Sequence, residues 1–409
     1  MKLKTTALTL ALLALAACGP GGGGGGGGVT GCNLSGTIDT QVTLTPSACN
    51  PYHVTGDLYV EEPGKLVIEP GTTLEFAQDT GLYVSGHGAL VAVGTAADKI
   101  LFTGASKTRG YWNGVVFQSF ANSLDNELKY AVIEYAGADE KWDGGAFGYY
   151  RAAVELEEEA RTKMTYTLVR ESEGFGVFMA NDAFFGADSS PDGDFAHNTL
   201  TQNAAGPIAI YENKVGHLDA SNDFSGNDTG HDYVYVGAGY TDIPTQTWQN
   251  LNVPYLIMDK ASVGNGELLT IEAGTTLVFD QDAGLEAYGD AAAIKAIGTP
   301  SAYITFTGKQ PIKGYWAGLH FDDSDSADNV LRYVIVEYGG GEDGFLGADA
   351  KGNIVVSSSG NASHQRITIE DSTVRYSLHW GISVAQETAD TINNVTYDGN
   401  NDGDYQKRP

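Results

Sequence analysis

Four oxygen-bearing side chains near the end of the chain have the spacing of a calcium loop. Asp398, Asn400 and Asp402, followed by Gly403, match the first half of an EF-hand loop, and Asp404 adds a further carboxylate. The bidentate Glu of that motif is missing, and Asn, Asp and Gly are also the residues that any tight turn requires. A calcium site at Asp398, Asn400, Asp402 and Asp404 and an ordinary turn are therefore both open, and calcium is the one cofactor that the sequence suggests.

Three cysteines carry a second kind of chemistry. Cys32 and Cys49 lie 17 residues apart, and an even pair in an oxidising compartment indicates a disulfide. A closed loop of that length is worth roughly 3 kcal/mol in the chain-entropy model. We expect the pair to staple the N-terminal edge of the fold.

The third cysteine, Cys18, follows a short apolar segment. Lys2 and Lys4 give a positive start, residues 5–17 are almost wholly apolar, and the segment ends in Leu15-Ala16-Ala17-Cys18. That ending resembles the lipobox of bacterial lipoproteins, which implies cleavage before Cys18 and a lipid on its sulfur. A segment of this length is too short to span a membrane as a helix, which needs about 20 apolar residues. We therefore expect a signal peptide at 1–17 and a body outside the cytoplasm.

A glycine-rich segment follows the lipid site, and the chain as a whole is acidic. Residues 19–28 are nine Gly and one Pro, which is typical of a flexible tether, so 18–31 is expected to hold the body away from the membrane. With 52 acidic against 23 basic residues, the net charge is −29. Nucleic-acid binding is excluded as a function, because phosphate recognition needs a basic face.

The remaining sequence contains one long tandem repeat. Gly71-Thr72-Thr73-Leu74 returns as Gly274-Thr275-Thr276-Leu277, and Gly110-Tyr111-Trp112 returns as Gly314-Tyr315-Trp316. The offset stays between 203 and 205, and the order is kept. We therefore expect block one at 32–240, with the disulfide cap, and block two at 241–409, continuous with block one.

Within each block the sequence indicates short strands and no long amphipathic helix. Runs such as 65–68 and 82–84 are rich in branched and aromatic residues and are bounded by Gly, Asn, Asp and Pro. Two-residue hairpin signals are scarce, so a chain wound repeatedly in one direction is favoured over an antiparallel meander. About 25 residues per coil predicts roughly 12 to 15 coils and 60 to 70 Å of stack.

Four motifs make the resemblance to a family specific. They are Pro70-Gly71-Thr72-Thr73-Leu74, Leu90-Val91-Ala92-Val93-Gly94-Thr95, Tyr111-Trp112-Asn113-Gly114 and Tyr130-Ala131-Val132-Ile133-Glu134-Tyr135. The sequence resembles the right-handed parallel β-helix repeat proteins of bacterial envelopes, relatives in fold of the pectate lyases. The resemblance implies an all-β fold, a right-handed parallel β-helix (solenoid) made by tandem duplication of one block of coils. It does not carry function over, because the family includes lyases, hydrolases and adhesins.

Candidate catalytic motifs of that family are incomplete. His87 lies in a Gly-His-Gly triplet that polygalacturonases use, but the repeat has Asp290 there and the other motifs are absent. Asp322-Asp323 could form a carboxylate pair, yet block one has Gln118-Ser119 instead. A pectate-lyase mechanism needs an arginine base beside clustered Asp residues; Arg170 and Arg375 recur, but neither lies in a recognisable acidic motif. We interpret these residues as a turn histidine, a solvated acidic turn and ion-pairing arginines, with a partner such as Glu171, and predict no catalytic residue.

Aromatic residues and loops indicate where a ligand could bind. Trp112 and Trp316 occupy one framework position, so we interpret them as packing residues, whereas Trp142 lies in a non-repeated loop. After Tyr135 and again after Tyr338 a long acidic loop interrupts the coil, and we expect both loops on the same flank. The predicted binding residues are Trp142, Phe345, Asp139, Asp143, Glu342 and Asp343.

Together these observations predict a bacterial cell-surface lipoprotein. The expected function is a non-enzymatic β-helix module for binding or adhesion, with a glycan (polysaccharide) or an envelope protein as partner. The alternative is a polysaccharide lyase or glycoside hydrolase of the same fold. We expect a monomer in the cell envelope, held at the outer membrane or cell surface by its lipid.

Overall fold

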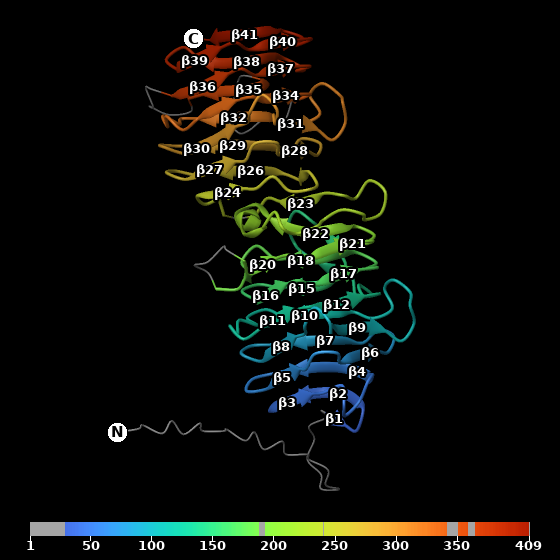
Figure 1. The fold of residues 1–409 in the computed structure, drawn as a ribbon. Helices are drawn as coiled ribbons and strands as arrows, with labels where there is room; N and C mark the ends of the chain where they lie inside the picture. The colour runs from blue at the N-terminus through green and yellow to red at the C-terminus, as the bar shows by residue number, and fades with distance from the viewer. Residues whose placement is uncertain (1–28, 188–192, 240, 342–350, 359–364, 409) are drawn as a thin grey trace, which may run out of the picture.

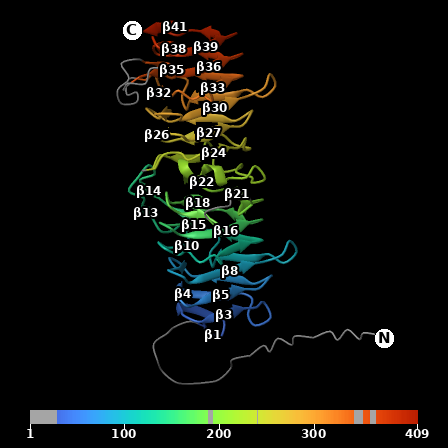
Figure 2. The same ribbon diagram turned by 90° about the vertical axis from the view of Figure 1, so that its left-hand side faces the viewer.

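The chain forms one elongated stack of short strands, seen from two sides in Figures 1 and 2. The computed structural model describes residues 29–187, 193–239, 241–341, 351–358 and 365–408. Cys18, Glu342, Asp343 and Phe345 lie outside these residues. In the described part of the chain, no helix is long and apolar enough to cross a membrane.

A single ladder of parallel strands runs the full length of the stack. Each strand pairs with the next, and the ladder joins fourteen strands, within the 12 to 15 coils expected. In order, they are β2 (Asn33–Ile38), β4 (Tyr52–Val60), β7 (Gly81–Val84), β10 (Gly114–Phe117), β15 (Ala152–Leu156), β18 (Phe175–Met179), β22 (Gly206–Tyr211), β23 (Val234–Gly237), β25 (Tyr255–Ile257), β28 (Thr276–Phe279), β31 (Ile304–Gly308), β34 (Val334–Glu337), β37 (Thr373–Arg375) and β40 (Thr396–Asp398).

Further sheets complete the coils, so each block is a right-handed parallel β-helix. In block one they are β6 (Thr73–Phe76), β9 (Ile100–Gly104), β12 (Ala131–Glu134), β17 (Leu168–Arg170) and β21 (Thr199–Thr201), and then β3 (Gln41–Leu44), β5 (Lys65–Ile68), β8 (Ala89–Val93), β11 (Glu127–Lys129), β16 (Arg161–Thr165), β19 (Phe184–Phe185) and β20 (Phe195–Ala196). In block two they are β26 (Lys260–Val263), β29 (Gly284–Tyr288), β32 (Gly318–Asp322), β35 (Gly352–Ser357), β38 (Trp380–Ala385) and β41 (Gly403–Arg408), and then β24 (Gln246–Trp248), β27 (Leu268–Ile271), β30 (Ala293–Ile297), β33 (Val330–Arg332), β36 (Arg366–Glu370) and β39 (Ala389–Asn393).

Three small features in the described residues depart from this regular winding. A hairpin of β13 (Lys141–Trp142) and β14 (Tyr149–Tyr150) interrupts block one, and a short 3₁₀ helix, η1 (Glu212–His217), follows β22. At the N-terminal end β1 (Val29–Thr30) pairs antiparallel with β2.

The strands form because their side chains alternate between the core and the outside. In β5, Leu66 and Ile68 are buried while Lys65 and Val67 are partly exposed, as the period of two of a strand requires. The inward residues of all coils join into one continuous apolar cluster from Leu34 to Val384. Burial of this narrow core is the main force that holds the stack together.

Single residues in the left-handed conformation make one corner of successive coils. Tyr130, Tyr166 and His197, at φ 48°, 54° and 58°, join the strands of one sheet to those of the next. Each non-glycine residue in this conformation costs roughly 1–2 kcal/mol. Stacking offsets part of that cost, because the ring centroids of Tyr130 and Tyr166 lie 4.7 Å apart and those of Tyr166 and His197 4.5 Å apart.

Asparagine ladders inside the turns satisfy backbone groups that the strands leave unpaired. The Asn198 side chain accepts a hydrogen bond from Thr167 N and donates one to the Met164 carbonyl, and Asn222 accepts from Asn198 N at 2.9 Å. These side chains are buried, so the bonds are made where water cannot replace them. Asparagine side chains of successive coils therefore form a ladder in these turns.

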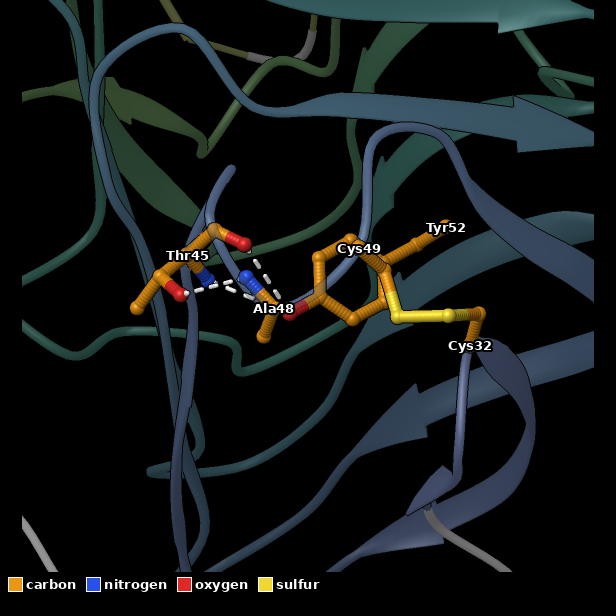
Figure 3. Close-up of a disulfide and its surroundings, with 5 residues drawn as sticks. All are labelled: Cys32, Thr45, Ala48, Cys49 and Tyr52. Atoms are coloured by element: carbon orange, nitrogen blue, oxygen red, sulfur yellow. Dashed lines mark hydrogen bonds between the residues drawn. A yellow bond between two sulfur atoms is a disulfide. The ribbon is translucent and has the colours of Figure 1, made fainter. Parts of the chain in front are cut away.

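The disulfide closes the N-terminal end as expected, and Figure 3 shows its surroundings. Cys32 and Cys49 are bonded, with their Cα atoms 5.6 Å apart. Beside them the Tyr52 hydroxyl donates to the Thr45 carbonyl at 3.2 Å, and Ala48 N donates to the same carbonyl at 3.2 Å. The bond thus fixes the turn that leads from β3 to β4 at the exposed end of the stack.

The two blocks share one sheet across their junction, but with different strands. By sequence β28, β31 and β34 correspond to β6, β9 and β12, yet they continue the ladder of β7, β10, β15 and β18 through β23 and β25. The junction therefore has no linker. It does offset block two by one strand relative to block one.

This offset bears on the expectation that both long loops lie along one edge. The loop of block one enters the shared sheet ahead of β15, whereas in block two the chain leaves the same sheet at the end of β34. Because all these strands are parallel, the described ends of the two loops lie at opposite edges of that sheet. Repeated sequence does not require that equivalent strands stack on each other. Residues 342–350 lie outside the described part of the chain, so the position of the second loop itself stays a prediction.

Candidate functional site

The loop of block one folds into an ordered hairpin beside the shared sheet. Lys141 pairs with Tyr150 and Trp142 with Tyr149, and Figure 2 shows β13 and β14 at the edge of the stack. Asp143 organises the turn, because its Oδ2 accepts hydrogen bonds from Gly145 N at 3.1 Å and Phe147 N at 3.3 Å.

An ion pair anchors one side of the hairpin to the sheet beneath it. Lys141 Nζ lies 2.6 Å from Glu155 Oε2 and 2.8 Å from Glu157 Oε1. The Glu155 side chain points outward from β15 but is only 1% exposed. Burial raises the pKa of Glu155 to about 7, although the positive charge of Lys141 acts to lower it. Burial lowers the pKa of Lys141, but the two carboxylates outweigh it and leave the pKa raised.

Aromatic contacts anchor the other side. The Tyr150 ring stacks on Phe178 with centroids 3.7 Å apart, and the Phe147 ring meets Phe178 edge-on at 5.7 Å. The Tyr211 hydroxyl donates to Asp143 Oδ2 at 2.6 Å, and burial together with Asp143 raises the pKa of Tyr211. The hairpin is therefore a rigid element, which is what a binding surface needs in order to limit the entropy lost on binding.

Two aromatic rings remain at the surface of this hairpin. Trp142 is 62% exposed and Tyr149 is 72% exposed, and their ring centroids lie 4.8 Å apart at an interplanar angle of 54°. Neighbouring exposed aromatic rings offer apolar faces with a polar edge, the combination common at recognition surfaces.

A groove of about 290 Å³ lies beside this pair. It combines aromatic walls with charged side chains, the usual make-up of a ligand site. Glu140 and Arg151 form an ion pair in it at 3.5 Å. The lining residues are Glu140, Phe147, Tyr149, Tyr150, Arg151, Glu173, Gly174, Phe175, Ala205, Tyr235 and Met258.

The predicted binding residues that the structure describes lie in different environments. Trp142 and Asp139 are exposed, whereas Asp143 is used within the hairpin and bonds Tyr211. Sequence reasoning missed Tyr149 and Tyr150, although the aromatic run at 147–150 close to Trp142 was a usable signal. It could not find Phe175 and Tyr235, because they reach the groove from other coils.

The predicted calcium residues make other contacts. Asn400 Oδ1 accepts from Ser377 N at 3.0 Å, as part of a ladder, and Asp402 Oδ2 lies 2.8 Å from His379 Nδ1. In the described residues, no group of three or more His, Cys, Asp or Glu is arranged to hold a metal ion.

The recurring framework residues have structural contacts. Trp112 and Trp316 are fully buried, as the packing interpretation predicts. Arg170 pairs with Glu134 at 2.7 Å and Arg375 with Glu337 at 2.7 Å. The expected partner Glu171 was wrong, because the ion pair joins neighbouring coils rather than neighbouring residues.

The turn residues lie apart from the groove. His87 is exposed in the turn between β7 and β8, and Asp322 ends β32. Neither residue lines the groove beside Trp142.

Comparison with known proteins supports the fold. Residues 36–160 match the family model of a pectate-lyase-like β-helix domain. The protein bark beetle of Drosophila melanogaster is 40% identical over 70 residues, which is 17% of this chain and 2% of that protein. The chain thus spans a very small part of that relative. No solved structure matches.

Proposed function

We propose that block one of this chain, a β-helix of the pectate-lyase-like type, is a non-catalytic glycan-binding module of the bacterial cell surface. Trp142 and Tyr149 form the contact surface, and the adjoining groove holds the ligand. The observation that supports this best is the pair of exposed rings on a hairpin anchored by Lys141 and Tyr150. A rigid aromatic surface beside a polar groove suits the flat apolar faces and hydroxyl edges of sugar rings.

The charge of the site favours one class of glycan. Glu140 and Glu173 line the groove, Asp139 is exposed beside it, and the whole chain carries −29. A polyanionic glycan would be repelled by this field, whereas a neutral or amino-sugar glycan would not. Arg151 is already paired with Glu140, which leaves the local balance acidic.

The same proposal includes the location of the protein. Cys18 carries the lipid, residues 18–31 form the tether, and the body is displayed as a monomer from the outer membrane or cell surface. An envelope protein is the second candidate partner, because exposed aromatic residues also dominate protein interfaces.

Binding of neutral, amino-sugar and anionic oligosaccharides to the soluble body (residues 29–409) tests the proposal. We expect measurable affinity for one of the first two classes and a loss of at least tenfold in Trp142→Ala and Tyr149→Ala. Tyr303→Ala is the control, because Tyr303 is an exposed tyrosine on a different coil. Equal binding by all variants would show that the binding site does not include Trp142 or Tyr149. Cleavage of the oligosaccharide would instead support the alternative, a polysaccharide lyase or glycoside hydrolase.

A further inference from the structure

Block two carries a glutamate, a histidine and a serine in a linear series on the outward-facing side of one sheet. His320 Nδ1 lies 2.8 Å from Glu286 Oε1, and His320 Nε2 lies 2.6 Å from Ser357 Oγ. This is the order of contacts in a nucleophile–base–acid triad, in which the ring connects the hydroxyl to the carboxylate.

Strand register brings the three residues together. Glu286 on β29 pairs with His320 on β32, and Ser357 ends the next strand, β35, opposite Asp322. The neighbouring positions Leu285, Leu319 and Ile354 point into the core, so the triad faces outward from a rigid sheet. His320 is 3% exposed and Ser357 4% exposed, and a polar series with so little water access keeps its contacts fixed.

The repeat does not require these residues. In block one the equivalent positions, by strand register, are Tyr83, Val116 and Glu157. Tyr83 and Val116 are buried there without any ionic contact between them. The triad is therefore specific to block two, and the shared architecture alone gives no reason for it.

We propose that Ser357 is the nucleophile of an acyl-ester hydrolysis site, with His320 as its base. Glu286 is a positioning residue, because its carboxylate, 2.8 Å from His320 Nδ1, stabilises the imidazolium that forms when Nε2 accepts the Ser357 proton. The substrate class is an ester of a small carboxylic acid. This inference does not depend on the glycan-binding proposal, which concerns block one.

The steps balance with water as the second reactant. Ser357 Oγ bonds to the ester carbonyl carbon while its proton passes to His320 Nε2. The carbon–oxygen bond to the alcohol then breaks, and the alcohol leaves with that proton. Water next attacks the acyl-serine, gives a proton to His320, and the acid departs as Ser357 regains its hydrogen.

Two charged neighbours shape the site. Asp322 Oδ1 lies 2.7 Å from Ser357 Oγ, so the single hydroxyl hydrogen has two acceptors, Asp322 and His320. Arg408 Nη2 donates to the carbonyl of Val356, the residue before Ser357, at 3.0 Å. This contact holds a cation beside the strand residue that precedes Ser357.

Ser357 lies at the end of β35, as the last residue of that strand, and the next residue, Ser358, is exposed. The Ser358 hydroxyl donates to Asp323 at 2.8 Å, in the same way that Ser357 contacts Asp322. Ser358 therefore provides a matched control that has the serine–aspartate contact without the bond to His320.

Labelling with a small fluorophosphonate tests the proposal on the soluble body at pH 8. We expect the label on Ser357, identified by mass spectrometry, and slow turnover of p-nitrophenyl acetate. Ser357→Ala should abolish both signals and Ser358→Ala should retain them. No label on the wild type, or a label that persists in Ser357→Ala, would overturn the inference.

The histidine and the glutamate are tested by rate and by pH. His320→Gln should slow labelling at least 100-fold, and Glu286→Gln should slow it roughly tenfold and shift its pH profile. Glu286→Asp should restore part of the rate, which a merely structural role would not predict. Circular dichroism confirms that each variant is folded, and Ser357→Ala, which removes one oxygen atom, remains decisive if the His320 variant unfolds.

Discussion

Arg109 and Asp228 are 119 residues apart in sequence, yet the guanidinium of Arg109 donates two hydrogen bonds, of 2.8 and 3.0 Å, to the Asp228 carboxylate. The same side chain donates to Glu171 at 2.9 Å and to the Gln202 carbonyl at 2.7 Å. Arg109 thus connects the loop after β9 to several later coils. In block two the corresponding connection between coils is a single hydrogen bond, which Lys313 donates to Asn401 Oδ1 at 2.6 Å.

We expect Arg109→Ala to lower the free energy of unfolding by about 1–2 kcal/mol, because a planar bidentate network is worth more than an isolated surface pair. Arg109→Lys should recover little of the loss, since an ammonium cannot span the same acceptors. Urea denaturation measures the difference. Lys313→Ala is the control and should cost less, and a loss equal to that of Arg109→Ala would contradict the argument.

Removal of the Cys32–Cys49 bond should destabilise the N-terminal end by roughly 3 kcal/mol, because the open chain regains the entropy of the loop. The double variant Cys32→Ser/Cys49→Ser should melt at lower temperature and lose hydrogen-exchange protection first in β2 and β4. If hydrogen-exchange protection is lost first in block two, unfolding does not begin at the disulfide-bonded N-terminal end.

Lys141→Met should loosen the hairpin, because it leaves Glu155 buried without its cation, a change that costs about 3–5 kcal/mol in comparable sites. Chymotrypsin reports the effect directly, since Trp142 and Tyr149 are exposed cleavage sites within the hairpin. Cleavage should be faster in Lys141→Met, while the rest of the chain stays folded. The pair Lys141→Met/Glu155→Gln should restore resistance, and unchanged cleavage in the single variant would refute the anchor.

Stability should rise as the pH falls from 8 to 5. Burial raises the pKa of both Glu155 and Glu212 to about 7 from an ordinary value of 4.5, so between these values the folded state holds protons that the unfolded state lacks. Above pH 7 both states are ionised and the cost of the buried charge is fully present. For Glu212 the gain is at most about 3 kcal/mol. Glu212→Gln should flatten the pH dependence of urea denaturation, and an unchanged slope would contradict the assignment.

Cys18 should carry a fatty acid. Growth of an expressing bacterium with a labelled fatty acid should mark the wild-type protein and leave Cys18→Ser unlabelled. The variant should also move from the membrane fraction to the soluble fraction, because the proposed anchor is the lipid rather than a spanning helix. Equal labelling of both proteins would end the lipoprotein proposal.

Sequence alone predicted the repeat, the parallel β-helix and the disulfide, because each depends on local signals. The apolar period of two, the Gly and Asn turns and the pair Cys32 and Cys49 can all be recognised without knowing which coils touch. The buried Trp112 and Trp316 followed from their recurrence at one framework position.

Contacts between coils could not be predicted in the same way. Glu286, His320 and Ser357 are separated by 34 and 37 positions, and only the register of β29, β32 and β35 brings them together. The partner of Arg170 was missed for the same reason, since Glu134 belongs to the preceding coil. The offset between blocks depends on which strand β25 receives as its neighbour, which no local pattern specifies.

That offset at β25 has a geometric consequence for any long ligand. Equivalent points on the two blocks are displaced sideways by about one strand, or roughly 13–17 Å for strands of four to five residues. A stiff filament that touched equivalent strands of both blocks would have to cross the shared sheet diagonally. One laid straight along the stack would meet strands of block two that do not correspond to those it met in block one.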